Sequence, residues 1–313
     1  MGEPVKQRCV WVDAARCLAM VCILWLHAGG APRWLGGVVG GSICFFFLLA
    51  GYFMPREAGA AAKRALQLGL AWLLWSALSA GLYALAQPEA AWTWQRAVGW
   101  GVPAYNTPLW FLRNLCIYQL LLAGMIALRL LPRYKWLALF LLLGFTYAAE
   151  PAQHVGLRFD WLPAALLGYN LKDIALQRVR DWLVQHARAL VVLGVALFVQ
   201  CEYYPLWLAH VGLHGYSCSL PAMQLCWAVG FALLAIGLES CCKRFAHAMA
   251  QCGSCMLFIY AGHSLAFAPF YIMDLPPVCR FATMMLVMVF LTILCRFLLK
   301  TAPAPMRYLM GRG

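Results

Sequence analysis

With 313 residues, 64% of them hydrophobic and only 11% charged, this chain is too apolar for a soluble domain of its size. Its repeated apolar runs of about twenty residues, the length that crosses the hydrocarbon core of a bilayer, indicate a polytopic membrane protein. The net charge of +13 is therefore assigned to loops on the cytoplasmic side, which set orientation, and nucleic acid is not expected as a partner.

Ten membrane spans can be drawn along the chain, and they predict an all-α bundle that forms a single domain over 1–313. The spans are 10–30, 36–54, 66–86, 108–130, 134–149, 160–176, 188–206, 218–240, 252–272 and 279–299. With the N terminus inside, the inner loops hold seventeen of the Lys and Arg residues and the outer loops hold three. Both termini are therefore predicted to be cytoplasmic.

The first span carries Asp13, Arg16 and His27 within an otherwise apolar stretch. These charges and the length of the stretch argue against a cleaved signal peptide. Eleven helical steps of about 100° place Arg16 and His27 on one face, about 16 Å apart along the axis, and Asp13 lies one turn before Arg16. Because an ionisable group in lipid costs several kcal/mol, this same-face pair predicts a functional site. The alternative is that Arg16 reaches the inner headgroups and His27 caps the outer end.

Two later spans contain further buried polar residues. Arg113 and Asn114 lie one to two turns inside the outer end of the fourth span, and His263 lies in the outer half of the ninth. Arg113 needs a partner, for which Glu150 and Asp160 on the outer side are the candidates. A structural ion pair for Arg113 and a helix–helix hydrogen bond for His263 are the alternatives to a site.

Other patterns have ordinary explanations. The outer connection 87–107 is rich in Trp and Tyr, which suits either a platform for sugar rings or the interfacial aromatic belt of membrane proteins. His210 and His214 have the spacing of a metal pair without a third ligand. Most of the fourteen Cys lie in apolar runs, where Cys is a small hydrophobe, and Cys252–Cys255 lacks a second paired motif. No metal is expected.

The combination of Asp13, Arg16 and, ten residues later, His27 in the first span resembles the acyltransferase-3 family of integral membrane acyltransferases. Other segments resemble family motifs in the same order: Phe45–Phe53, Lys63 with Arg64, Pro108–Leu112, Trp161–Pro163 with Leu167–Tyr169, and Tyr260 with His263. The likeness extends from residue 10 to about residue 265. The chain has Cys17 where the family usually has Gly and Ala50 where it usually has Ser, positions that are expected to tune packing.

The resemblance implies an O-acyltransferase of the bacterial plasma membrane that uses acyl-coenzyme A as the donor on the cytoplasmic side. The acceptor is expected to be a hydroxyl of an extracytoplasmic or lipid-linked carbohydrate. Such a transfer needs a donor anchor, a general base and groups that stabilise an oxyanion. Arg16, Lys63 and Arg64 are expected to bind the donor phosphates, and His27 is expected to be the base.

Arg113 and His263 are expected to orient the acceptor or stabilise the oxyanion. The acyl group, the acceptor and the oligomeric state are not predicted. A different class of protein, a polytopic transporter or a lipid or glycan flippase, would use the buried Arg and His side chains to bind its substrate. A third hypothesis is a membrane scaffold without catalytic activity, in which Arg16 and His27 face lipid or packed helices.

Overall fold

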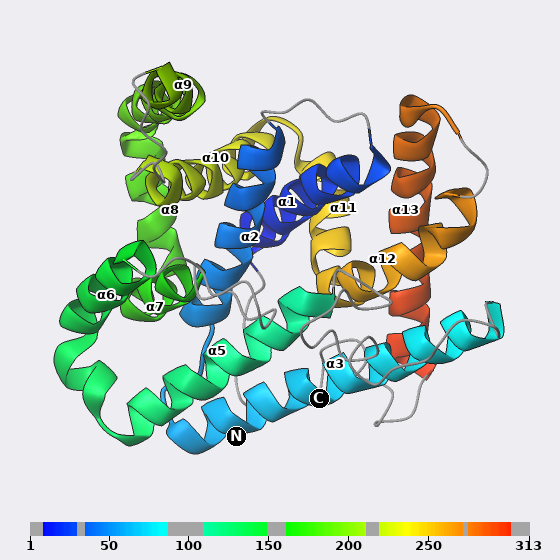
Figure 1. Ribbon diagram of the computed structural model, residues 1–313, viewed down its shortest axis with the longest axis horizontal. Helices are drawn as coiled ribbons and strands as arrows, with labels where there is room; N and C mark the ends of the chain where they lie inside the picture. Colours follow the sequence, from blue (N-terminus) through cyan, green and yellow to red (C-terminus); the bar gives the residue numbers. More distant parts are fainter. Residues whose placement is uncertain are drawn as a thin grey trace. The chain divides into compact units, whose positions relative to one another are not determined.

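The computed structural model describes residues 9–29, 35–86, 109–148, 161–210, 219–271 and 275–301 (Figure 1). Within these ranges every regular element is a helix and there is no strand, which confirms the all-α fold. The apolar composition explains this choice, because a helix satisfies its backbone hydrogen bonds internally, as a lipid environment requires.

The helices follow the predicted spans. They are α1 (Val10–Ala28), α2 (Leu35–Tyr52), α3 (Ala58–Ala86), α5 (Leu109–Ala127), α6 (Leu130–Ala148), α7 (Leu162–Leu171), α9 (Ala187–His210), α10 (Ser219–Cys241), α12 (Met256–Tyr271) and α13 (Pro277–Thr301). Helix α3 begins before the predicted span of 66–86, so Lys63 and Arg64 lie within its first turns.

Two short helices were not predicted, α8 (Leu176–Gln185) and α11 (Lys243–Gly253). Both are amphipathic and carry basic residues. In α8 the apolar Leu176, Val179 and Leu183 recur at helical spacing, and Leu183 is buried.

Several of these helices are suited to a bilayer. Among the described residues, five segments are long and apolar enough to cross it: Val10–Ala28, Ala58–Leu85, Leu109–Ala127, Gln224–Cys241 and Pro277–Thr301. Helix α8 and the first part of α9, bent by 74°, make a sixth if they count as one span. Gly37–Tyr52, Leu162–Leu171 and Met256–Ala266 are shorter apolar helices. The chain is a multi-pass membrane protein, and the number of ten spans stays a prediction.

The surface of α3 supports the same conclusion. Exposed leucines run along this helix: Leu66, Leu70, Leu73, Leu74, Leu78, Leu82 and Leu85. A soluble domain rarely exposes so long an apolar face, whereas a bilayer solvates it.

The chain divides into two compact units, and each is described by itself. The first contains residues 1–45 and 174–256, and the second contains residues 46–173 and 257–313. In the first unit α1 packs against α10 and α11, and α10 also packs against α8 and α9. In the second unit α3 and α5 lie side by side, and α6 packs against α7 (Figure 1).

Glycines set the closest helix crossings. A Cβ on Gly253 of α11 would lie 1.7 Å from the backbone oxygen of Asp13 in α1, so α11 approaches α1 at backbone distance. In the second unit a Cβ on Gly51 of α2 would lie 1.8 Å from the oxygen of Ala165, and one on Gly168 of α7 would lie 1.9 Å from the oxygen of Leu48. Only glycine fits at these three positions.

Candidate functional site

The Asp13–Arg16 pair forms as the helical spacing predicts. Arg16 Nη1 donates to Asp13 Oδ1 at 2.8 Å, and the two side chains are 27% and 10% exposed. Residues on every side of them in α1 are buried, including Val12, Ala15 and Cys17. The carboxylate therefore compensates part of the guanidinium charge in a place of low polarity, and the remaining Arg16 donors stay oriented by a short, charge-assisted bond.

His27 lies in the last turn of α1 and is half-buried. The helix ends at Ala28, and the next residue, Gly29, has a φ of 76°, a conformation that glycine adopts readily. Met20 and Ile23 lie between Arg16 and His27 on the same face of α1, and both are buried. Any group that reaches from Arg16 to His27 along this face must therefore displace whatever covers Met20 and Ile23.

The Cys252–Cys255 motif lies at the crossing of α11 with α1. Gly253 touches the Asp13 backbone, and the buried Cys17 side chain lies close to that of Cys252. No group of three metal ligands occurs among the described residues. This segment therefore holds α11 against the turn of α1 that carries Asp13 and Arg16.

Arg113 and Asn114 of α5 belong to the second unit and are buried, at 3% and 0% exposure. Neither amide atom of Asn114 has a hydrogen-bond partner within the described part of the chain. The neighbouring Phe111 joins an aromatic cluster, with ring centroids 4.8 Å from both Phe47 and Tyr260. A buried amide of this kind needs a polar partner to offset its desolvation.

His263 of α12 is 1% exposed, and its hydrogen bonds define its tautomer. Nδ1 lies 2.7 Å from the backbone oxygen of Tyr260. Since a carbonyl only accepts, Nδ1 carries the proton and donates, which leaves Nε2 as the acceptor in the neutral ring. The Ser264 hydroxyl lies 3.4 Å from Nε2. His263 is thus positioned to accept a proton or a hydrogen bond at Nε2.

A basic cluster forms where α2 and α7 end in the second unit, directly after their crossing at Gly51 and Gly168. We define it as Arg56, Lys63, Arg64, Lys135 and Lys172. Arg64 Nη1 donates to the oxygen of Phe53, and Lys172 Nζ donates to that of Met54 at 3.0 Å. These cations therefore satisfy carbonyls just past the C-terminal end of α2.

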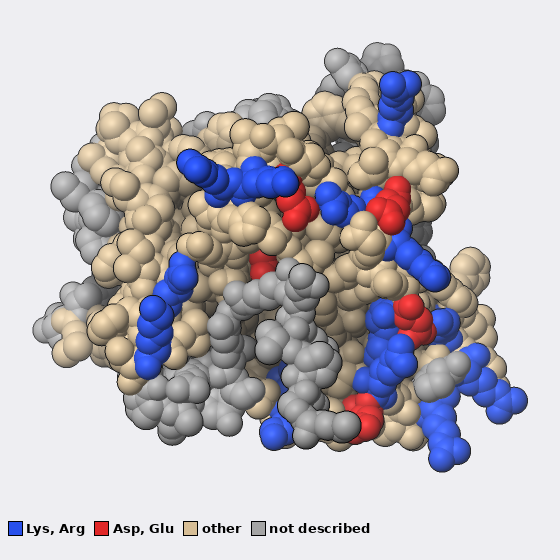
Figure 2. Space-filling view, turned by 180° about the vertical axis from the view of Figure 1, so that it is seen from behind, with Lys and Arg blue, Asp and Glu red and all other residues tan. Residues whose placement is uncertain are grey.

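Asp173 is the carboxylate within the basic cluster. It pairs with Arg56 through one oxygen and lies 3.8 Å from Lys135 Nζ through the other. Lys172 Nζ also lies 4.1 Å from the Tyr169 ring centroid. Partial burial and the nearby Arg56 lower the pKa of Lys172 to about 8. Figure 2 shows Lys and Arg side chains gathered in groups with single Asp or Glu side chains among them.

The predicted site residues fall into the two units. Arg16 and His27 belong to the first, on one face of α1, and Lys63, Arg64, Arg113 and His263 belong to the second. The interpretation of the sequence did not assign Arg56, Lys135, Lys172 or Asp173 to a site. The first three were counted only as charges that set orientation, and the signal that could have identified the cluster is an acidic residue among inner-loop cations.

Some predictions fall outside the described residues. They are the proposed Arg113 partners Glu150 and Asp160, the aromatic connection 87–107, and His214. The side chain of His210 is also outside the described part.

Comparison with known families identifies a match over most of the chain. The family model described as an acyltransferase domain matches residues 10–299, which includes Arg16, His27, the basic cluster, Arg113 and His263. Neither the comparison with curated proteins nor that with solved structures gives a match. The match nevertheless covers most of the chain and agrees with an all-α, multi-pass architecture. The chain therefore belongs to the acyltransferase-3 family and is a membrane acyltransferase that transfers groups other than amino-acyl groups.

Proposed function

We propose that this acyltransferase moves an acetyl or similar group from acyl-coenzyme A on the cytoplasmic side to a hydroxyl of an extracytoplasmic or lipid-linked carbohydrate. The observation that carries the proposal is the placement of Arg16, fixed by Asp13, on the same face of α1 as His27. The proposal includes a single domain of ten spans with both termini cytoplasmic, in the cytoplasmic membrane of a bacterium.

The donor would bind through its phosphates. Arg16, Lys63 and Arg64 are the proposed contacts, and the structure supports adding Lys172, Arg56 and Lys135 to them. Arg64 and Lys172 are already held by backbone oxygens of Phe53 and Met54, so their remaining N–H donors are oriented before a ligand arrives. Orientation in advance lowers the entropy cost of binding a multiply charged phosphate group.

His27 would be the general base. Its neutral imidazole takes the proton from the acceptor hydroxyl, whose oxygen attacks the thioester carbonyl carbon. The tetrahedral oxyanion then collapses and expels the coenzyme A thiolate, which takes up a proton to become the thiol. The donor arm must pass the positions of Met20 and Ile23, both buried, so movement of the side chains that cover them is part of the proposal.

Arg113 and His263 would act on the acceptor or on the oxyanion. The Arg113 guanidinium supplies positive charge, and His263 presents Nε2 as an acceptor because Nδ1 donates to Tyr260. Asn114, fully buried and without a hydrogen-bond partner among the described residues, would supply a further amide donor beside Arg113.

The test uses the purified full chain in vesicles, with acyl-coenzyme A labelled in its acyl group and a carbohydrate acceptor. Arg16→Ala should raise the apparent KM for the donor more than it lowers kcat, because Arg16 contributes donor binding. His27→Gln should lower kcat about 10²- to 10⁴-fold with donor binding retained, because it removes the base. Arg244→Ala and His247→Gln, exposed positions on α11, are the matched controls.

Three results would contradict the proposal. Near-normal turnover by His27→Gln would leave His27 a structural role. Equal donor affinity in the wild type and Arg16→Ala would remove the donor anchor from α1. Movement of a carbohydrate lipid across the vesicle without any acyl donor or acylated product would favour the transporter hypothesis.

A further inference from the structure

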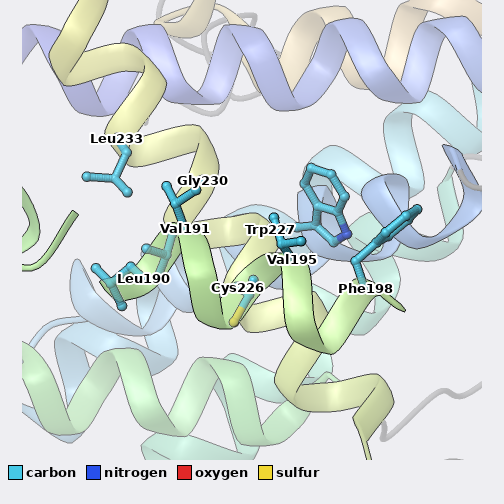
Figure 3. Close-up of a pocket in the computed structure, with 10 residues that line it drawn as sticks. Leu190, Val191, Val195, Phe198, Cys226, Trp227, Gly230 and Leu233 are labelled. Carbon is cyan, nitrogen blue, oxygen red and sulfur yellow. The ribbon is translucent and has the colours of Figure 1, made fainter. Parts of the chain in front are cut away.

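An apolar groove lies between α9 and α10 in the first unit. None of the residues that line it belongs to the candidate site described above. Its volume is about 260 Å³. Leu190 and Leu233 lie at one end, and Phe198 and Trp227 close the other, with ring centroids 6.1 Å apart (Figure 3). From residue 190 to residue 198 the groove follows α9 for about 12 Å, close to the roughly 15 Å depth of one hydrocarbon leaflet.

Two glycines leave this groove unfilled. A Cβ on Gly230 of α10 would meet nothing within 4 Å, and one on Gly194 of α9 would come no closer than 3.8 Å to Cys226. A Cβ is therefore accommodated at both positions without moving the backbone, so close helix packing does not require glycine there. Val191 and Val195, on the rim, are each 58% exposed. The groove thus opens to the surroundings of the two helices, which in a bilayer are hydrocarbon chains.

Positive charge lies at the Leu190 end. There the chain bends by 74° from α9 into amphipathic α8, which the ion pair of Arg180 with Glu239, at 3.7 Å, holds to α10. If α9 crosses the membrane, a helix bent so far from it runs near the membrane surface. Arg188 lies two residues after the bend at His186, and Arg178 lies in the first turn of α8, at the end of that helix away from the bend. Both are exposed, and neither makes an ion pair or a hydrogen bond with a residue that the structure describes.

The charged groups near the bend are three arginines, Arg178, Arg180 and Arg188, and two carboxylates, Asp181 and Glu239, so one net positive charge remains there. Asp181 of α8 accepts a hydrogen bond from Gln177 at 2.9 Å, and Glu239 is occupied by Arg180. His186 at the bend places Nδ1 2.9 Å from the backbone oxygen of Trp182 and stacks on the Trp182 ring.

We propose that this groove binds one acyl chain of an anionic phospholipid, whose headgroup lies against Arg188, with Arg178 of α8 adding to the positive charge at that end. The apolar lining, the depth of about one leaflet and the cations at the shallow end together match this class of lipid. None of the lining residues is assigned to the proposed acyl-transfer site, and the proposal does not depend on the transfer mechanism.

The test uses the full chain in phosphatidylcholine vesicles that contain a trace of phosphatidylglycerol with a photoreactive acyl chain. After illumination, the crosslinked peptides are mapped. Crosslinks should concentrate on residues 190–198 and 226–233. Excess unlabelled phosphatidylglycerol should displace them, and excess phosphatidylcholine should not.

Two variants separate the chain from the headgroup. Gly230→Leu should lower crosslinking in the groove about tenfold, as expected when the groove loses room for about two methylene groups. Gly81→Leu, the same change at an open, exposed glycine of α3, should leave it unchanged and serves as the matched control. The double variant Arg178→Gln with Arg188→Gln should reduce the preference for phosphatidylglycerol about tenfold while the chain still enters the groove.

Full crosslinking in Gly230→Leu, at a thermal stability equal to that of Gly81→Leu, would overturn the proposal. Equal competition by both phospholipids would remove the anionic headgroup from it. Displacement by a polyprenyl phosphate at lower concentration than by phosphatidylglycerol would assign the groove to a different lipid and would also refute it.

Discussion

Replacing Gly253 with Ala tests whether the contact between α11 and α1 holds the turn that carries Asp13 and Arg16. The new Cβ would lie 1.7 Å from the Asp13 oxygen, whereas ordinary contacts of a Cβ begin at 3.4 Å, so the two backbones must separate by about 1.7 Å. Overpacking of this kind lowers the free energy of unfolding by about 1–3 kcal/mol. Here the new methyl group meets the backbone oxygen of Asp13, which cannot rotate away as a side chain could. We expect a lower melting temperature and a higher apparent KM for acyl-coenzyme A.

Thermal unfolding in detergent and donor titration measure the two effects. Gly237→Ala is the matched control, because Gly237 is an exposed helical glycine of α10 in the same unit and a Cβ there meets nothing within 4 Å. Because Ala has a higher helix propensity than Gly, Gly237→Ala should stabilise α10 by up to about 1 kcal/mol. If Gly253→Ala melts at or above the temperature of Gly237→Ala, the backbone contact does not exist in the native protein. If Gly253→Ala melts at a lower temperature than Gly237→Ala but binds acyl-coenzyme A with normal affinity, the contact between α11 and α1 does not position Arg16.

Two further predictions concern charge and topology. Because the pKa of Lys172 is lowered to about 8, its charge is lost as pH rises through that value, and donor affinity should fall between about pH 7 and pH 9. Lys172→Arg, charged throughout, should flatten this dependence, and an unchanged pH profile would exclude Lys172 from donor binding. A single labelled cysteine at residue 95 should react from outside intact cells, and reaction only after permeabilisation would refute the proposed orientation.

The sequence predicted the helices well because hydropathy and lipid solvation act on the same residues. A run long enough to cross a bilayer must be helical, and each predicted span overlaps a helix. The short helices α8 and α11 were not predicted, because their apolar residues recur on one face and their average hydropathy is low. Their ends also depend on the bends next to His186 and Cys242, which are tertiary features.

The candidate site was predictable where it depends on one helix. The spacing of Asp13, Arg16 and His27 is a property of α1 alone, and the Asp13–Arg16 bond follows from it. The basic cluster depends on the crossing of α2 and α7 at Gly51 and Gly168, which brings residues far apart in sequence together. Hydropathy and charge counts carry no information about such a crossing, so the pairing of Arg56 with Asp173 was not predicted.

The geometry of α2 connects helix packing to the arrangement of the cations that are proposed to bind the donor. Gly51 lets the α2 backbone touch that of α7, and the chain then leaves the helix with the Phe53 and Met54 oxygens directed at cations. Arg64 and Lys172 satisfy these oxygens and so cannot swing freely, whereas exposed Lys63 can contribute charge without a fixed direction. A side chain at residue 51 would separate the helices and leave the cations without their anchors. Gly51, within the Phe45–Phe53 segment, is therefore required for the arrangement of the positively charged Arg64 and Lys172.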